Sequence, residues 1–129
     1  MSAMTVLVVD DDPFVLGFMN AKISSWGYEA IPASSGKDAI LRLKDRKIDA
    51  VVLDYMMPQM SGIATLEEIR KFNKDVPVIM FTAGADEKSM ENIGRLNITA
   101  YIPKSSVSEG NQSLLETTLS MIRKKLNKR

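Results

Sequence analysis

The chain alternates between short runs of apolar residues and longer segments in which apolar residues recur every three or four positions. Four runs are almost uniformly apolar, which is typical of strands covered on both faces in a parallel sheet. A fifth, weaker candidate lies between the first two. The five predicted strands are residues 6–9, 28–31, 50–53, 76–81 and 98–102.

Helical patterns separate these strands. Asp12 followed by Pro13 is typical of a helix N-terminus, and Gly27 ends that helix. Ser35 with Asp38 three residues later forms a loose capping box at the start of a second helix. The remaining predicted helices are Ile63–Phe72, a short segment around Met90 and Ile93, and Leu115–Leu126.

Strand and helix therefore alternate five times with short connections, and no linker or repeat interrupts them. This pattern predicts one domain over residues 1–129 with an α/β fold, in which helices cover both faces of a parallel sheet. Pro103 predicts that the fifth strand lies at a sheet edge, because proline cannot donate to a strand ladder.

Composition removes several classes of function. The 129 residues include no His and no Cys, which excludes disulfides, thiolate catalysis and metal sites built from those residues. A bound metal would need oxygen ligands and would be a hard cation. The net charge of +1 argues against a direct nucleic-acid-binding role. Residues 111–129 carry five basic side chains and one acidic, which we interpret as a solvated helix end, with a partner-docking surface as the alternative.

The sequence contains neither a membrane span nor a secretion signal. No apolar run approaches ~18 residues, and the N-terminus lacks a charged region followed by an apolar stretch. We therefore expect a cytoplasmic protein without membrane insertion.

Polar side chains stand at the carboxyl ends of four predicted strands, where ligands bind in open α/β sheets. Crowded carboxylates repel one another and need a cation, for which Mg²⁺ is a usual choice beside phosphate, with Mn²⁺ as an alternative. A hydroxyl can donate to a phosphoryl oxygen, an ammonium can neutralise one, and an aspartate can form an aspartyl phosphate. The set therefore predicts Mg²⁺-dependent phosphoryl transfer to an aspartate. Its members are Asp10, Asp11, Asp12, Asp54, Thr82 and Lys104.

Taken singly, these residues have ordinary structural explanations. Asp12 fits a helix cap, Asp54 a turn residue and Lys104 a surface lysine. The right residue types at four strand ends together favour one shared site.

Four segments resemble the receiver domain of two-component response regulators, and the resemblance extends over residues 6–126. Val8–Pro13 resembles the family's acidic segment, Phe81–Ala83 its switch threonine with a small neighbour, and Tyr101–Lys104 its aromatic switch position and lysine. The most specific signal is Leu53–Gly62, which resembles the phospho-acceptor segment.

The resemblance implies a three-layer, doubly wound, flavodoxin-like (βα)5 fold with strand order 2-1-3-4-5. It implies that Asp54 accepts a phosphoryl group from a phosphohistidine on a partner histidine kinase or phosphotransfer protein. Asp11 and Asp54 would bind Mg²⁺ directly, with the Met56 backbone carbonyl as a third protein ligand. Asp10 would act through metal-bound water.

The resemblance also implies roles for the later strand ends. Lys104 would pair with Asp54 and then with the phosphoryl oxygens, Thr82 would move toward the phosphoryl group, and Tyr101 would turn inward behind it. The face formed by the fourth helix, the fifth strand and the fifth helix would signal this state to a downstream protein. Such a chain is a phosphorylated signalling protein rather than an enzyme, although it gains and loses the phosphoryl group through its own chemistry.

One departure from the family pattern is clear. Ser105 follows Lys104 where the family usually has Pro, and Pro103 precedes it in place of an aliphatic residue. Neither change removes a chemical group from the site. A phosphorylation-independent pseudo-receiver is one alternative, favoured only by Ser105.

An enzyme of the haloacid-dehalogenase-like phosphatase class is a second alternative. It would use Asp10 and Asp12 but would leave the segment Asp54–Gly62 unexplained. A nucleotide-binding Rossmann domain is weaker still, because no GxGxxG follows the first strand.

The absence of His also limits the role of this chain in phosphoryl transfer. The chain cannot supply its own phosphohistidine, so the donor must arrive on another domain or molecule. The receiver would use almost all 129 residues. We therefore expect either a single-domain regulator or the receiver of a longer chain.

Overall fold

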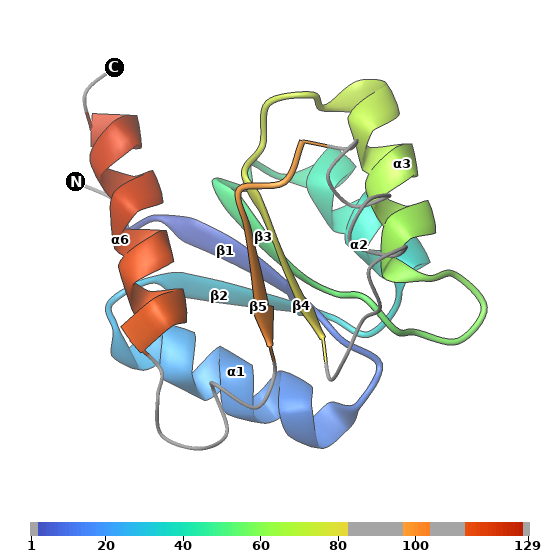
Figure 1. The fold of residues 1–129 in the computed structure, drawn as a ribbon, viewed down its shortest axis with the longest axis horizontal. Helices are drawn as coiled ribbons and strands as arrows, with labels where there is room; N and C mark the ends of the chain where they lie inside the picture. Colours follow the sequence, from blue (N-terminus) through green and yellow to red (C-terminus); the bar gives the residue numbers. More distant parts are fainter. Residues whose placement is uncertain (1–2, 83–96, 104–112, 128–129) are drawn as a thin grey trace.

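Five parallel strands form one sheet in the order β2-β1-β3-β4-β5 (Figure 1). This computed structural model describes residues 3–82, 97–103 and 113–127. The strands are β1 Thr5–Val9, β2 Glu29–Ala33, β3 Ala50–Asp54, β4 Val78–Thr82 and β5 Ala100–Pro103. Each neighbouring pair is parallel. The predicted α/β fold class and the strand order are confirmed.

The part of the chain that the structure describes contains four helices. They are α1 Pro13–Ser25, α2 Gly36–Asp45, α3 Gly62–Phe72 and α6 Ser113–Asn127. Helices α1 and α6 cover one face of the sheet, and α2 and α3 cover the other (Figure 1). The short helix predicted around Met90 and Ile93 lies outside the described residues.

Successive strand residues belong to two apolar cores, one on each face of the sheet. In β1, Leu7 and Val9 join the core shared with α2 and α3, whereas Val6 and Val8 join the core shared with α1 and α6. All five residues of β1 are buried. Because neither face meets water, the strand has no polar alternation, which explains the uniform apolar run in the sequence.

Side-chain caps fix where three helices begin. Asp12, Ser35 and Ser61 each accept a backbone N–H from the first turn of α1, α2 and α3, at 2.9, 3.0 and 3.1 Å. These caps satisfy donors that have no partner inside the helix. The sequence therefore predicts these helix starts closely.

Strand ends are less well predicted than helix starts. β2 extends to Ala33, two residues beyond the predicted end, and β4 begins at Val78 rather than Val76. Pro32 fits within β2 because that strand lies at a sheet edge, where a missing N–H needs no partner. β5 lies at the opposite edge, as Pro103 predicted.

Helix length and composition also bear on membrane insertion. Within the described ranges, no helix has both the length and the apolar character needed to cross a bilayer.

Candidate functional site

Three carboxylates converge at the carboxyl edge of the sheet. Asp10 and Asp11 follow β1, and Asp54 ends β3, which pairs directly with β1. Each offers an oxygen atom within 4.8 Å of those of the other two. Asp10 and Asp54 are 0% exposed, while Asp11 is exposed to solvent. The structure thus brings together three of the four aspartates in the predicted set.

Backbone N–H groups orient the two buried carboxylates. The Asp12 N–H donates to Asp10 Oδ1 at 2.9 Å, and the Met56 N–H donates to Asp54 Oδ1 at 3.2 Å. Both donors lie two residues after their acceptors, a local turn pattern that holds an Asp side chain against its own backbone. These bonds hold each carboxylate in place relative to the strand end that carries it.

Asp12 has a different function from its neighbours. Its Oδ1 accepts the Phe14 N–H at 2.9 Å and caps α1. The metal-compatible cluster consists of the other three aspartates. The structural explanation of Asp12 as a cap is therefore the one that the geometry supports.

The loop after Asp54 folds tightly back on the strand end. The Gly62 N–H donates to the Tyr55 carbonyl at 2.9 Å. A Cβ at Gly62 would clash with the Asp54 carbonyl oxygen and would lie 2.8 Å from Tyr55 Cα. Gln59 has a φ of 66°, in the left-handed region. Gly62 is thus required for close approach, a structural role that the sequence pattern did not reveal.

The cluster has a clear electrostatic requirement. Three carboxylates in this space repel one another, and two of them lie away from water, so a cation lowers the energy of the site. The side-chain donors are all oxygen atoms, which fits Mg²⁺ or Mn²⁺ better than a soft metal. The residues present therefore fit a hard divalent cation.

The later predicted site residues lie on β4, β5 and beyond. Thr82 ends β4, one position after Phe81, the partner of Asp54 in the sheet register. Tyr101 lies on β5, half-buried, and packs against the core beneath α2 and α3. Lys104 and Ser105 lie outside the described residues. The backbone therefore brings Thr82 to the same edge of the sheet as the aspartates.

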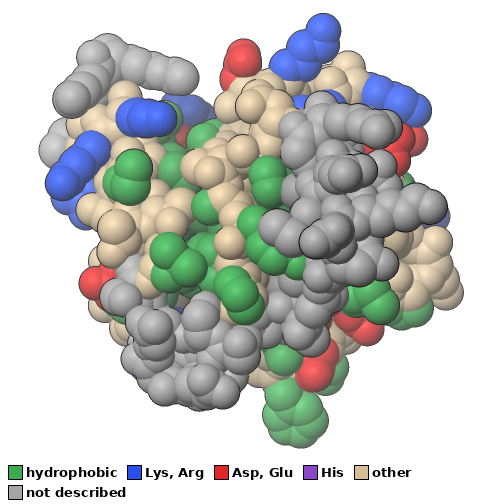
Figure 2. All heavy atoms as spheres, in the orientation of Figure 1, with side chains coloured by type: hydrophobic (Ala, Val, Ile, Leu, Met, Phe, Trp, Pro, Cys, Tyr) green, Lys and Arg blue, Asp and Glu red, His purple; other side chains and the backbone are tan. Residues whose placement is uncertain are grey.

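Two exposed aromatic side chains follow the acidic residues Asp10 and Asp11 along the chain. Phe14, in the first turn of α1, is 87% exposed, and Phe18, one turn later, is 43% exposed. Figure 2 shows hydrophobic and acidic side chains next to one another at this end of α1. The exposure of Phe14 could not be predicted from the sequence, because periodicity does not tell which apolar position of a helix stays in solvent.

Sequence comparisons agree on one family. The family model described as the response regulator receiver domain matches residues 6–116. The transcriptional regulatory protein ZraR of Escherichia coli O157:H7 is 33% identical over 115 residues, which cover 89% of this chain and 26% of that protein. The chain spans about a quarter of the length of the first curated relatives it matches.

Solved structures share the fold. The response regulator TrrA of Thermotoga maritima, solved in complex with Mg(2+)-BeF, is 29% identical, with a TM-score of 0.81 and coverage of 92% of this chain and 98% of that one. A CheY-like receiver domain protein of Methanospirillum hungatei JF-1 has a TM-score of 0.88 at 23% identity, covering 99% of this chain and 100% of that one. The second likeness shows the fold alone.

Proposed function

This chain belongs to the response regulator receiver domain family of two-component systems, and from that premise we propose that Asp54 accepts a phosphoryl group from a phosphohistidine on a partner protein. The observation that carries the proposal is the carboxylate cluster, whose three oxygen atoms lie within 4.8 Å of one another around a buried Asp54. The proposal treats residues 1–129 as one receiver domain in the cytoplasm.

The transfer step requires a correctly placed carboxylate. An Asp54 oxygen attacks phosphorus in line with the P–N bond of the donor, a P–O bond forms, and the P–N bond breaks. The electron pair passes to the imidazole nitrogen, which takes a proton from solvent. The Met56 N–H bond to Asp54 Oδ1 fixes the carboxylate rotamer and so reduces the cost of aligning the nucleophile.

The acidic neighbours of Asp54 would hold the metal ion. Asp11 and Asp54 would bind Mg²⁺ directly, with the Met56 backbone carbonyl as a third ligand and Asp10 acting through water. When bound, the cation would neutralise charge on the transferring phosphoryl group. The relative solved with Mg(2+)-BeF supports this choice of ion.

The remaining roles follow the family pattern. Lys104 would neutralise a phosphoryl oxygen, and Thr82 would donate a hydrogen bond to another. Tyr101 would turn inward behind Thr82. The donor would be a histidine kinase or a phosphotransfer protein, and the exposed Phe14, three residues after Asp11, would offer it a contact surface. A downstream protein would then bind the surface around β5 and α6.

Incubation with Mg²⁺ and acetyl phosphate, followed by intact mass spectrometry, tests this proposal. We expect one added phosphoryl group on the wild-type chain and none on Asp54→Asn. Equal labelling of both proteins would contradict the assignment of Asp54. Labelling of neither would favour the phosphorylation-independent pseudo-receiver. Steady hydrolysis of varied phosphomonoesters that depends on Asp10 would favour the phosphatase.

A further inference from the structure

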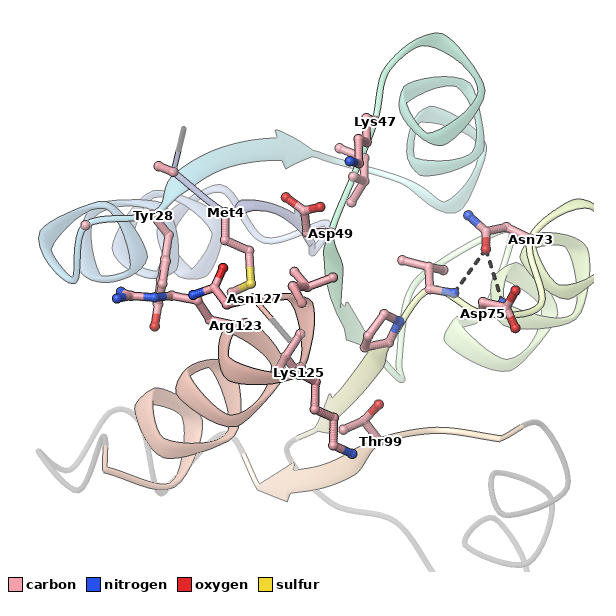
Figure 3. Close-up of a pocket in the computed structure, with 17 residues that line it drawn as sticks. Met4, Tyr28, Lys47, Asp49, Asn73, Asp75, Thr99, Arg123, Lys125 and Asn127 are labelled. Carbon is pink, nitrogen blue, oxygen red and sulfur yellow. Dashed lines mark hydrogen bonds between the residues drawn. The ribbon is translucent and has the colours of Figure 1, made fainter. Parts of the chain in front are cut away.

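A groove of about 1020 Å³ lies at the amino-terminal edge of the sheet, the edge opposite Asp54 (Figure 3). One wall is formed by the last two turns of α6. Residues immediately before or close to the start of all five strands form the rest. From β1 to β5, these are represented by Met4, Tyr28, Asp49, Pro77 and Thr99. The groove therefore crosses the whole end of the sheet, away from the phosphoryl chemistry.

Part of the groove lining consists of buried apolar side chains. Met4 and Ile122 belong to the core beneath α1 and α6, whereas Ile48 and Val76 belong to the core beneath α2 and α3. All four line the groove, and each is less than one-tenth exposed. The groove thus follows the ends of both apolar cores, and apolar side chains of a ligand would extend them.

The rim of the groove carries three cations. Lys47 stands before β3, and Arg123 and Lys125 stand on α6 (Figure 3). Over the described part of the chain, none of the three forms an ion pair. Figure 2 shows Lys and Arg side chains in the upper half of the molecule, where β4 and β5 begin.

The two carboxylates on the rim already interact with other groups. Asp49 Oδ2 accepts the Thr5 N–H at 2.8 Å. Burial lowers the pKa of Arg70, and the electrostatic attraction of Asp75 partly offsets that lowering. Asp49 and Asp75 keep their negative charges, but the three cations outnumber them, and Arg70 outside the groove offsets the charge of Asp75. The ligand that this excess of positive charge favours is an anion.

We propose that this groove binds an extended acidic peptide segment of a partner protein. In an extended chain successive side chains point to opposite sides. Alternate apolar residues would rest on Met4, Ile48 and Val76, while the acidic residues between them would reach the three rim cations. The groove crosses five strand ends, which suits an elongated segment better than a compact ligand.

The first test uses the wild-type protein and two labelled peptides followed by amide NMR. One peptide alternates Glu and Leu, and the other alternates Lys and Leu. We expect the Glu peptide to shift the amide resonances of Tyr28, Asp49 and Thr99, and the Lys peptide to leave them unchanged. Equal shifts with both peptides, or shifts confined to other surfaces, would overturn the proposal.

The second test changes the charge of α6. The double variant Arg123→Glu/Lys125→Glu should bind the Glu peptide about tenfold more weakly, because two attractions become repulsions. Lys124→Glu is the matched control, since it lies in the same turn but does not line the groove. If the control weakened peptide binding equally, only the overall charge would matter, and the proposed binding site would be wrong.

A single-stranded oligonucleotide serves as the competing anion. If it shifts the same resonances with the affinity of the Glu peptide, the surface is a general polyanion site and the peptide proposal fails. The wild-type titrations decide the proposal even if a variant does not fold. All of these results are independent of phosphorylation at Asp54.

Discussion

At the residue scale, Asp10 shows how like-charge repulsion in the acidic cluster affects the stability of the fold. Its carboxylate is fully buried within 4.8 Å of two others. Asp10→Asn removes one negative charge but keeps an oxygen acceptor for the Asp12 N–H. We expect the metal-free variant to be more stable than wild type by ~1 kcal/mol, because like-charge repulsion falls. Urea unfolding in the presence of a chelator measures this difference.

The control for that charge change is Glu67→Gln on α3. Glu67 is exposed and lies outside the acidic cluster. Its substitution should leave the free energy of unfolding unchanged within ~0.5 kcal/mol. Destabilisation of metal-free Asp10→Asn would show that the lost repulsion is outweighed by other interactions of the Asp10 carboxylate.

Substitution by alanine should have opposite effects on stability at two glycines. A Cβ at Gly62 would clash with the Asp54 carbonyl, whereas a Cβ at Gly17 in α1 would meet nothing within 4 Å. Gly62→Ala should destabilise the protein by ~2 kcal/mol through strain. Gly17→Ala should stabilise it by about 0.5–1 kcal/mol, because alanine is the better helix former. Urea midpoints of the two variants relative to wild type check this, and shifts of the same sign would contradict it.

The roles of the aspartates could be predicted from the sequence, whereas the role of Gly62 could not. Asp10, Asp11 and Asp54 could be predicted to meet because parallel topology brings strand ends to one edge. The clash at Gly62 depends on how the loop after β3 folds back, which a one-dimensional pattern does not contain. Residue chemistry was therefore predictable, and local close approach was not.

At the element scale, the first half of α1 carries two exposed aromatic side chains, Phe14 and Phe18, shortly after Asp11 in the chain. Phe14→Ala should lower kcat/KM for phosphoryl transfer from a protein donor by about tenfold, because exposed aromatic side chains are common interface anchors. Transfer from acetyl phosphate should not change, since that donor needs no docking surface. Rates of intact-mass labelling with each donor separate the two.

A matched control for Phe14 exists on α2. Leu41 is 59% exposed and lies on the other face of the sheet. Leu41→Ala should leave both labelling rates at the wild-type value. An equal loss with the small donor in Phe14→Ala would indicate a damaged site rather than a lost contact.

Arg70 links α3 to the starts of two strands. Its guanidinium donates to the carbonyls of Asn73 and Val76 before β4, at 3.2 and 2.9 Å, and to that of Asn97 before β5, at 2.8 Å. Arg70→Met should destabilise the protein by ~1–2 kcal/mol, because these bonds involve a charged donor. It should also speed amide exchange at Thr99, whose N–H donates to Val78.

The pH dependence of this contribution can be stated from the Arg70 pKa. Burial lowers that pKa and Asp75 raises it, but arginine starts so far above neutrality that it stays charged. The stability difference between wild type and Arg70→Met should therefore be constant between about pH 5 and 9. Lys71→Met is the control, since its ion pair with Glu68 is on the exposed surface. A strong pH dependence would contradict a permanently charged donor.

Elements could be predicted better at helix starts than at strand ends. Asp12, Ser35 and Ser61 cap helices through local hydrogen bonds, which a short sequence window contains. The bounds of β2 and β4 depend on pairing with β1 and β3, which are distant in sequence. The observed bounds of these two strands therefore differ from the predicted ones by one or two residues.

At the scale of the whole molecule, the two ends of the sheet differ in charge. The carboxyl edge carries Asp10, Asp11 and Asp54, whereas the groove at the amino edge is lined by three cations and two carboxylates. The alternation of strands and helices predicted the first edge because polar residues stand at the carboxyl ends of four predicted strands. The groove was not predictable, because each strand connection supplies only a few of its residues.

The acidic edge also predicts how the stability of the whole domain responds to Mg²⁺. A ligand that binds only the folded state stabilises it by RT ln(1 + [L]/Kd), about 2.7 kcal/mol at a hundredfold excess over Kd. The cluster exists only when β1 and β3 are paired, so Mg²⁺ should raise the free energy of unfolding of wild type along this curve. Asp54→Asn should respond far less, because one carboxylate is lost. Urea unfolding across a Mg²⁺ titration measures the free energy of unfolding of both proteins. KCl keeps the ionic strength constant, so that general charge screening does not change during the titration. An equal response of the two proteins would place the cation elsewhere on the molecule and remove the electrostatic basis for the buried cluster.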